Sequence, residues 1–87
     1  MALAPWPVVK PKDILEAARA NPVGVRFTHL VKLVLAMGYQ FHHQNGSHAI
    51  YKRPGFPSVN IQPIKSMAKD YQVIQVIGII DEYGIEV

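Results

Sequence analysis

An alternating stretch at residues 39–44, followed at once by Asn45-Gly46, constrains the fold of this chain more than any other feature. One face of the stretch carries Tyr39, Phe41 and His43. Such alternation is typical of a strand, because successive side chains of a strand point to opposite faces. Asn-Gly is the strongest short-range signal for a tight hairpin turn, since both of its residues tolerate positive φ. The pattern predicts a strand, a turn at 45–46 and a returning strand over about 47–53.

Apolar spacing predicts two helices before this hairpin. The i, i+3, i+4, i+7 pattern of a buried helical stripe starts at Phe27, and Gly38 stands where a C-terminal cap belongs. The stripe consists of Phe27, Leu30, Val31 and Val34. A shorter helix is predicted at about 12–20 and ends at Asn21-Pro22, because the residue before a proline avoids the helical conformation.

The C-terminal half is predicted to contain a third strand and a last helix. Beyond a Pro-Gly turn, residues 58–64 have the composition of a strand that closes a meander. The following segment 73–80 is rich in β-branched residues, which by propensity favours another strand. Its apolar residues nevertheless keep helical spacing, and Asp70 can cap the start of a helix and Gly84 its end. We expect a helix at about 70–83.

These elements predict a single α+β domain, a three-stranded antiparallel sheet with helices packed on one face. A chain of 87 residues can bury one compact core but not two independent ones. Residues 1–11 carry three prolines around Trp6, so we expect a non-helical arm there.

Basic residues are concentrated in the middle of the chain. Lys and Arg number 9 against 6 Asp and Glu, which gives a formal net charge of +3. The basic residues of the central region are Arg26, Lys32, Lys52, Arg53, Lys65 and Lys69. Most of the acidic residues lie nearer the two ends, as Asp13, Glu16, Asp81, Glu82 and Glu86. A basic centre between acidic flanks favours a polyanionic partner such as a nucleic acid.

The absence of cysteine excludes disulfides and thiolate zinc sites and leaves nothing that argues for an oxidising compartment. No segment approaches the roughly 20 apolar residues that a membrane-spanning helix needs. We therefore expect a cytoplasmic protein without a membrane partner.

Three of the four histidines crowd the predicted hairpin, at positions 42, 43 and 48. A turn at 45–46 would pair Gln44 with Ser47 and set His43 opposite His48, with Cβ atoms about 5 Å apart. Histidine titrates near pH ~6.5, so an imidazole can take up and return a proton at neutral pH. The hairpin is therefore a candidate for general acid–base chemistry, such as the attack of a hydroxyl on a phosphodiester.

Other interpretations of this cluster lead to different functions. Two facing imidazoles without a nearby carboxylate or thiolate fall short of the three or four ligands of a zinc site, so we expect no metal. Adjacent strand residues point to opposite faces, so Ser47 and His48 would not form a nucleophile and base pair. A structural interpretation, in which polar rings at the end of a hairpin simply meet solvent, stays open on composition alone.

Basic residues near the hairpin are candidates to neutralise phosphates through charge-assisted contacts. They are Lys52, Arg53, Lys65 and Lys69. The alternative is that these side chains form an ordinary solubilising surface.

Three segments of the chain resemble HicA toxins. Residues 41–51, Phe-His-His-Gln-Asn-Gly-Ser-His-Ala-Ile-Tyr, resemble the first hairpin of that family, in which Gly, Ser and His precede an apolar and aromatic strand. Residues 25–39 resemble the helix that leads into the hairpin. Residues 68–73, Ala-Lys-Asp-Tyr-Gln-Val, resemble the beginning of the family's last helix, and residues 83–85 its end.

The resemblance implies a fold like that of double-stranded-RNA-binding domains, with the order helix, three antiparallel strands, helix. Residues 23–87 would form this domain, and residues 1–22 an N-terminal extension with one extra short helix. The resemblance also implies a toxin that cleaves messenger RNA without a cofactor and is neutralised by a HicB-like antitoxin. By its position in the motif, the catalytic histidine is His48.

We therefore expect a metal-independent endoribonuclease in which His48 acts on the ribose 2′-hydroxyl or on the leaving 5′-oxygen. The second proton step would fall to His48 itself, His43, Tyr51 or water. The residues expected to contact RNA are Gly46, Ser47, Lys52, Arg53, Lys65 and Lys69. The rival hypothesis is a non-catalytic RNA-binding or antitoxin-paired module of the same fold, since such folds bind RNA by shape and phosphate.

Overall fold

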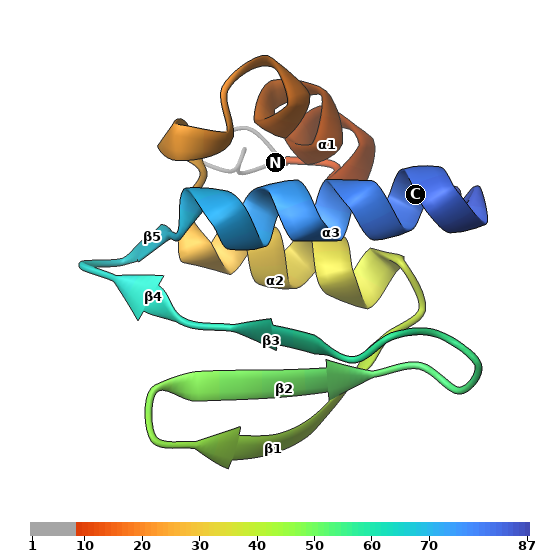
Figure 1. Ribbon diagram of the computed structural model, residues 1–87. Coiled ribbons are helices and arrows are strands. Elements are labelled where there is room, and N and C mark those ends of the chain that lie inside the picture. The colour runs from red at the N-terminus through yellow and green to blue at the C-terminus, as the bar shows by residue number, and fades with distance from the viewer. Residues whose placement is uncertain (1–8) are drawn as a thin grey trace, which may run out of the picture.

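The computed structural model describes residues 9–87 as an α+β fold with three α-helices and a three-stranded antiparallel sheet (Figure 1). The elements in chain order are α1 (Pro11–Ala20), the 3₁₀ turn η1 (Pro22–Gly24), α2 (Phe27–Ala36), β1 (Gln40–Asn45), β2 (His48–Lys52), β3 (Val59–Ile61), β4 (Pro63–Ile64), β5 (Met67–Ala68) and α3 (Asp70–Tyr83). Figure 1 shows α2 and α3 over one face of the sheet, with α1 beyond them. The predicted α+β class and antiparallel sheet are confirmed. The predicted arm before Val9 lies outside the described residues.

The first two helices begin and end where the sequence predicts. Pro11 is the first residue of α1, and the backbone becomes extended at Asn21. Helix α2 ends at Ala36, with Met37 as its C-cap and Gly38 just beyond it. Helix α1 buries Ile14 and Ala18. Of the predicted stripe of α2, Leu30 and Val34 are buried, together with Leu33, whereas Phe27 and Val31 are only partly buried.

The predicted last helix is confirmed over Asp70–Tyr83, although its β-branched residues favour a strand. Its buried apolar side chains are Val73, Val76, Ile79 and Ile80. Packing of this face outweighs a propensity difference of a few tenths of a kcal/mol per residue, roughly. Gly84 forms the C-cap as predicted. The N-cap is Lys69, so the prediction that Asp70 caps the helix was wrong, and the Asp70 carboxylate accepts the Tyr71 N–H from inside the first turn.

The hairpin exists, but its register differs from the predicted one. Asn45 pairs with His48, so the turn residues are Gly46 and Ser47. Gly46 has φ +60° at the first central position, as a type II′ turn requires. The prediction that His43 faces His48 was therefore wrong, because His43 pairs with Ile50. An irregularity between Phe41 and His43 then shifts the pairing again, so that Phe41 pairs with Tyr51.

The third strand is shorter than the predicted 58–64. It ends at Ile61 because the Gln62 N–H donates to the Gln72 side chain of α3 (2.9 Å) and Pro63 has no N–H to donate. The chain then forms a small two-stranded ribbon, β4–β5, which the sequence did not predict. The ribbon is anchored to the start of α2, because the Ala68 N–H donates to the Val25 carbonyl (2.9 Å).

One buried cluster holds the helices and the sheet together, and it includes Ile14 and Ala18 of α1. Helix α1 is also fixed to α3 at the surface by a bidentate ion pair between Arg19 and Asp81, with N···O distances of 2.5 and 2.9 Å. Within the described part of the chain, no helix is long and apolar enough to cross a membrane.

Candidate functional site

The face of the sheet that α2 and α3 leave uncovered carries the histidine singled out by its sequence motif. His48 is the first residue of β2 and is partly buried, whereas the next residue, Ala49, points into the core. Ile50 and Lys52 share the face of His48, because side chains alternate along a strand. On the neighbouring strand, Asn60 pairs with Ile50 and is exposed between two buried residues. The site is thus an open surface.

A hydrogen bond fixes the His48 imidazole. Its Nδ1 lies 2.8 Å from the amide oxygen of Asn60, its diagonal neighbour on β3. An amide oxygen can only accept, so Nδ1 carries the proton in this bond. In the neutral ring, the lone pair is then on Nε2, which is the nitrogen able to accept a proton from a substrate.

Asn60 was missed by the sequence analysis. The pattern Val59-Asn60-Ile61 places one polar residue between two apolar ones, which indicates the solvent face of a strand. Its proximity to His48 depends on the register of β2 with β3, which the sequence does not specify.

The other two hairpin histidines form a pair of their own. The Nδ1 atoms of His42 and His43 lie 2.6 Å apart, and the two ring centroids are 4.9 Å apart. This contact is unusual for adjacent strand residues and arises at the irregularity of β1. In residues 9–87, no group of three or more His, Cys, Asp or Glu side chains is arranged to hold a metal ion.

Tyr51 lies on the opposite side of the sheet from His48. It is only 7% exposed, and its ring packs edge-on against Phe41 at a centroid distance of 5.7 Å. Burial raises the pKa of the Tyr51 hydroxyl above its ordinary value. The structure therefore does not bring this expected helper together with His48.

The residues expected to contact RNA do not form one cluster. Gly46 and Ser47 form the exposed turn before His48, and Lys52 is exposed at the far end of β2. Lys65 lies instead in the turn between β4 and β5, and Lys69 directly follows β5.

Arg53 has structural contacts. Its Nη1 donates to the Met37 carbonyl at the end of α2 (2.7 Å), and its guanidinium carbon lies 4.0 Å from the ring centroid of Phe56. The guanidinium thus joins the end of β2 to the C-terminus of α2.

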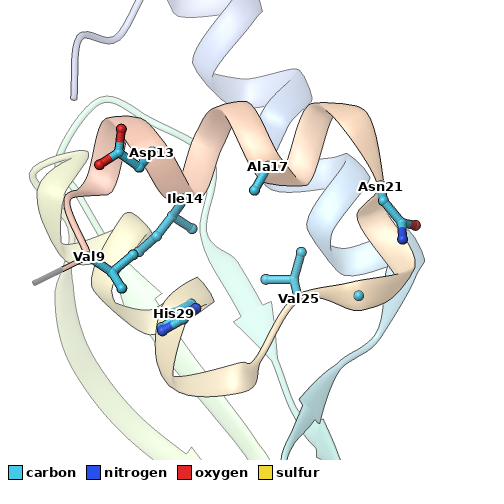
Figure 2. A pocket seen from close by; sticks show the side chains of 8 residues that line it. Val9, Asp13, Ile14, Ala17, Asn21, Val25 and His29 are labelled. Carbon is cyan, nitrogen blue, oxygen red and sulfur yellow. The ribbon is translucent and has the colours of Figure 1, made fainter. Parts of the chain in front are cut away.

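Two of the hollows in the described part of the chain lie beside helix α1 and beside the β4–β5 ribbon, and His48 lines neither of them. The first has a volume of about 430 Å³ and lies between α1, η1 and α2. Figure 2 shows its apolar lining from α1 and around Val25, with the fourth histidine, His29, at one side. The second has a volume of about 530 Å³ and lies between η1, the β4–β5 ribbon and the first turn of α3.

Comparison with known proteins identifies no relative. No protein-family model matches the sequence, and no curated protein and no solved structure is significantly similar to the chain. The functional interpretation therefore depends on the motif and on the geometry of the site.

Proposed function

We propose that the protein is a HicA-like toxin, an endoribonuclease that cleaves messenger RNA with His48 as its acid–base group. The observation that carries the proposal is the bond from His48 Nδ1 to Asn60, which leaves Nε2 able to accept a proton on an open face. The Gly-Ser-His motif and the resemblance of residues 23–87 to the family support it. A helix, a three-stranded antiparallel sheet and a last helix follow one another in the C-terminal part, as in double-stranded-RNA-binding domains, with the β4–β5 ribbon added before the last helix.

The proposed reaction is an internal transesterification. Nε2 of His48 takes the proton from a ribose 2′-hydroxyl, and the 2′-oxygen bonds to the adjacent phosphorus. The bond from phosphorus to the 5′-oxygen breaks, and that oxygen leaves with a proton from the imidazolium, from His43 or from water. The products are a 2′,3′-cyclic phosphate and a 5′-hydroxyl, so the step needs neither an oxidant nor a cofactor.

Of the two expected helpers, His43 fits the proposal better than Tyr51. His43 pairs with Ile50 on the face of His48, whereas Tyr51 is buried on the other face. Lys52 shares the open face and would neutralise a substrate phosphate, and Gly46 and Ser47 would contact the RNA backbone beside it. Arg53 is left out, because its guanidinium already holds the Met37 carbonyl.

The proposed partners follow from the same surface. A HicB-like antitoxin would neutralise the toxin by covering the uncovered sheet face, and the pair would act in the cytoplasm, where messenger RNA is translated. A non-catalytic RNA-binding module is the second candidate. The observation that favours it is that the hydrogen-bond partner of His48 is the side-chain amide of Asn60, which cannot take up or release a proton in catalysis.

The decisive experiment is RNA cleavage by the purified protein in EDTA, compared with His48→Ala. One positioned acid–base group is typically worth about 10²–10⁴-fold in rate, and we expect a loss of that size. His29→Ala is the matched control, because His29 lies away from the sheet between α1 and α2 and should leave cleavage unchanged. Equal cleavage by His48→Ala, or loss of all cleavage in EDTA, contradicts the proposal. Binding without cleavage by the wild type supports the non-catalytic module.

A further inference from the structure

The hollow beside the β4–β5 ribbon presents apolar side chains to solvent. Val23, Ile64 and Tyr71 line it and are 65%, 55% and 58% exposed. Clustered exposure of large apolar side chains is typical of a binding surface, whereas single ones are common on any protein. A hollow of about 530 Å³ is within the usual range for sites that hold one small organic group.

The charge around this groove selects an anionic occupant. Two of the lining residues are Lys65 and Lys69, and the Lys69 ammonium lies 5.9 Å from the ring centroid of Tyr71. The acidic lining residue is Asp70, whose carboxylate already accepts the Tyr71 N–H at 2.7 Å. An exposed aromatic ring in a groove that is also lined by two lysines is the chemistry that binds a nucleotide, with the base stacked and the phosphate neutralised.

The groove and His48 lie at the same end of the molecule. Figure 1 shows the turn between β1 and β2 at the end of the sheet where the β4–β5 ribbon also lies. His48 follows that turn directly, and its partner Asn60 is on β3. Ile64 is four residues after Asn60, so their Cα atoms are at most about 14 Å apart. One RNA strand can therefore contact both places.

We propose that this groove binds an unpaired nucleotide of the RNA strand that His48 cleaves. The base lies against Tyr71 and Ile64, and Lys65 and Lys69 neutralise the phosphate. Paired bases keep their faces within the helix stack, so the groove selects single-stranded RNA over duplex RNA. The inference rests on the proposed function and names its substrate class.

The test is direct binding to a fluorescein-labelled 12-nucleotide single-stranded RNA, measured by fluorescence anisotropy in the non-cleaving His48→Ala background. Adding Tyr71→Ala should raise Kd by about 5- to 150-fold, the range for loss of one stacked base. Tyr71→Phe keeps the ring and should bind normally. Ile74→Ala is the matched control, since Ile74 is 55% exposed on the same helix but does not line the groove.

Salt dependence tests the phosphate contact separately. Removing Lys65 and Lys69 together should reduce the slope of log K against log salt concentration by about 1.4, because each contact to a single strand contributes ~0.7. Lys32→Ala, an exposed lysine on α2, should leave both affinity and slope nearly unchanged. A duplex of the same sequence should bind more weakly and without dependence on Tyr71.

The outcomes separate this inference from the proposed function. If Tyr71→Ala binds the oligonucleotide as tightly as Ile74→Ala, the groove does not hold RNA, and a role in binding a protein would replace it. That result would leave cleavage by His48 untouched. If binding depends on Tyr71 but the wild type does not cleave RNA, the groove inference stands and the endoribonuclease proposal fails.

Discussion

The β4–β5 turn allows a stability prediction that can be calculated from its backbone. Lys65 and Ser66 have φ values of +48° and +66°, and in residues 9–87 they are the non-glycine residues with positive φ. This conformation costs an L-residue roughly 1–2 kcal/mol. Ser66→Gly removes that cost but adds backbone entropy to the unfolded chain, worth about 0.5–1 kcal/mol. We expect a net stabilisation of about 0.5–1 kcal/mol.

Thermal unfolding followed by circular dichroism measures this effect. For a domain of this size, 1 kcal/mol shifts Tm by about 4–8 °C, so Ser66→Gly should raise Tm by roughly 2–8 °C. Ser66→Ala removes the hydroxyl but keeps the strain, and it should bring no gain. Ser58→Gly, at a position without positive φ, should lower Tm slightly. A Tm for Ser66→Gly no higher than that of Ser66→Ala would refute the strain argument.

Three further predictions concern the remaining contacts. Asn60→Leu cannot accept the His48 Nδ1 proton and should lower kcat for RNA cleavage about tenfold. Asn60→Asp keeps an acceptor and should retain most of the wild-type kcat. Equal kcat values for the two variants would show that Asn60 does not take part in the mechanism. Arg53→Ala should lower the free energy of unfolding, measured in urea, by about 1–3 kcal/mol, because the hydrogen bond to the Met37 carbonyl and the cation–π contact with Phe56 are lost. The slope of log K for RNA binding against log salt concentration should stay unchanged. The hydrogen bond from Arg19 lowers the pKa of Asp81, so this ion pair stabilises the fold above the ordinary carboxyl pKa, and the stabilisation is lost as the pH falls through the lowered pKa. Asp81→Asn should therefore weaken the dependence of the unfolding free energy on pH in the acid range. An unchanged dependence would contradict the role given to this ion pair.

Helix positions could be predicted because one physical cause determines them. Apolar side chains at helical spacing must be buried together, and this rule located α2 and α3 even where β-branched residues favoured a strand. The hairpin could be predicted for the same reason, since alternation and Asn-Gly agree.

The errors arose where competing local conformations differ little in energy. A turn at 45–46 and one at 46–47 both use Gly46, and the choice between them sets which residue faces His48. The β4–β5 turn contains no glycine, so the sequence gives no turn signal there. Lys65 and Ser66 adopt positive φ in this turn, and contacts of β5 with Val25 hold them in that strained conformation. The hydrogen bond from His48 to Asn60 depends on the pairing of β2 with β3, which no local pattern encodes.

The ion pair between Arg19 and Asp81 has a consequence for protein synthesis. The two residues are 62 positions apart, so at about 5–20 residues per second the ribosome adds Asp81 roughly 3–12 s after Arg19. During that interval α1 and α2 exist without α3, and the apolar faces that all three helices share in one cluster are incompletely covered. The nascent chain therefore completes its fold, and with it the surface around His48, only after the last helix is made.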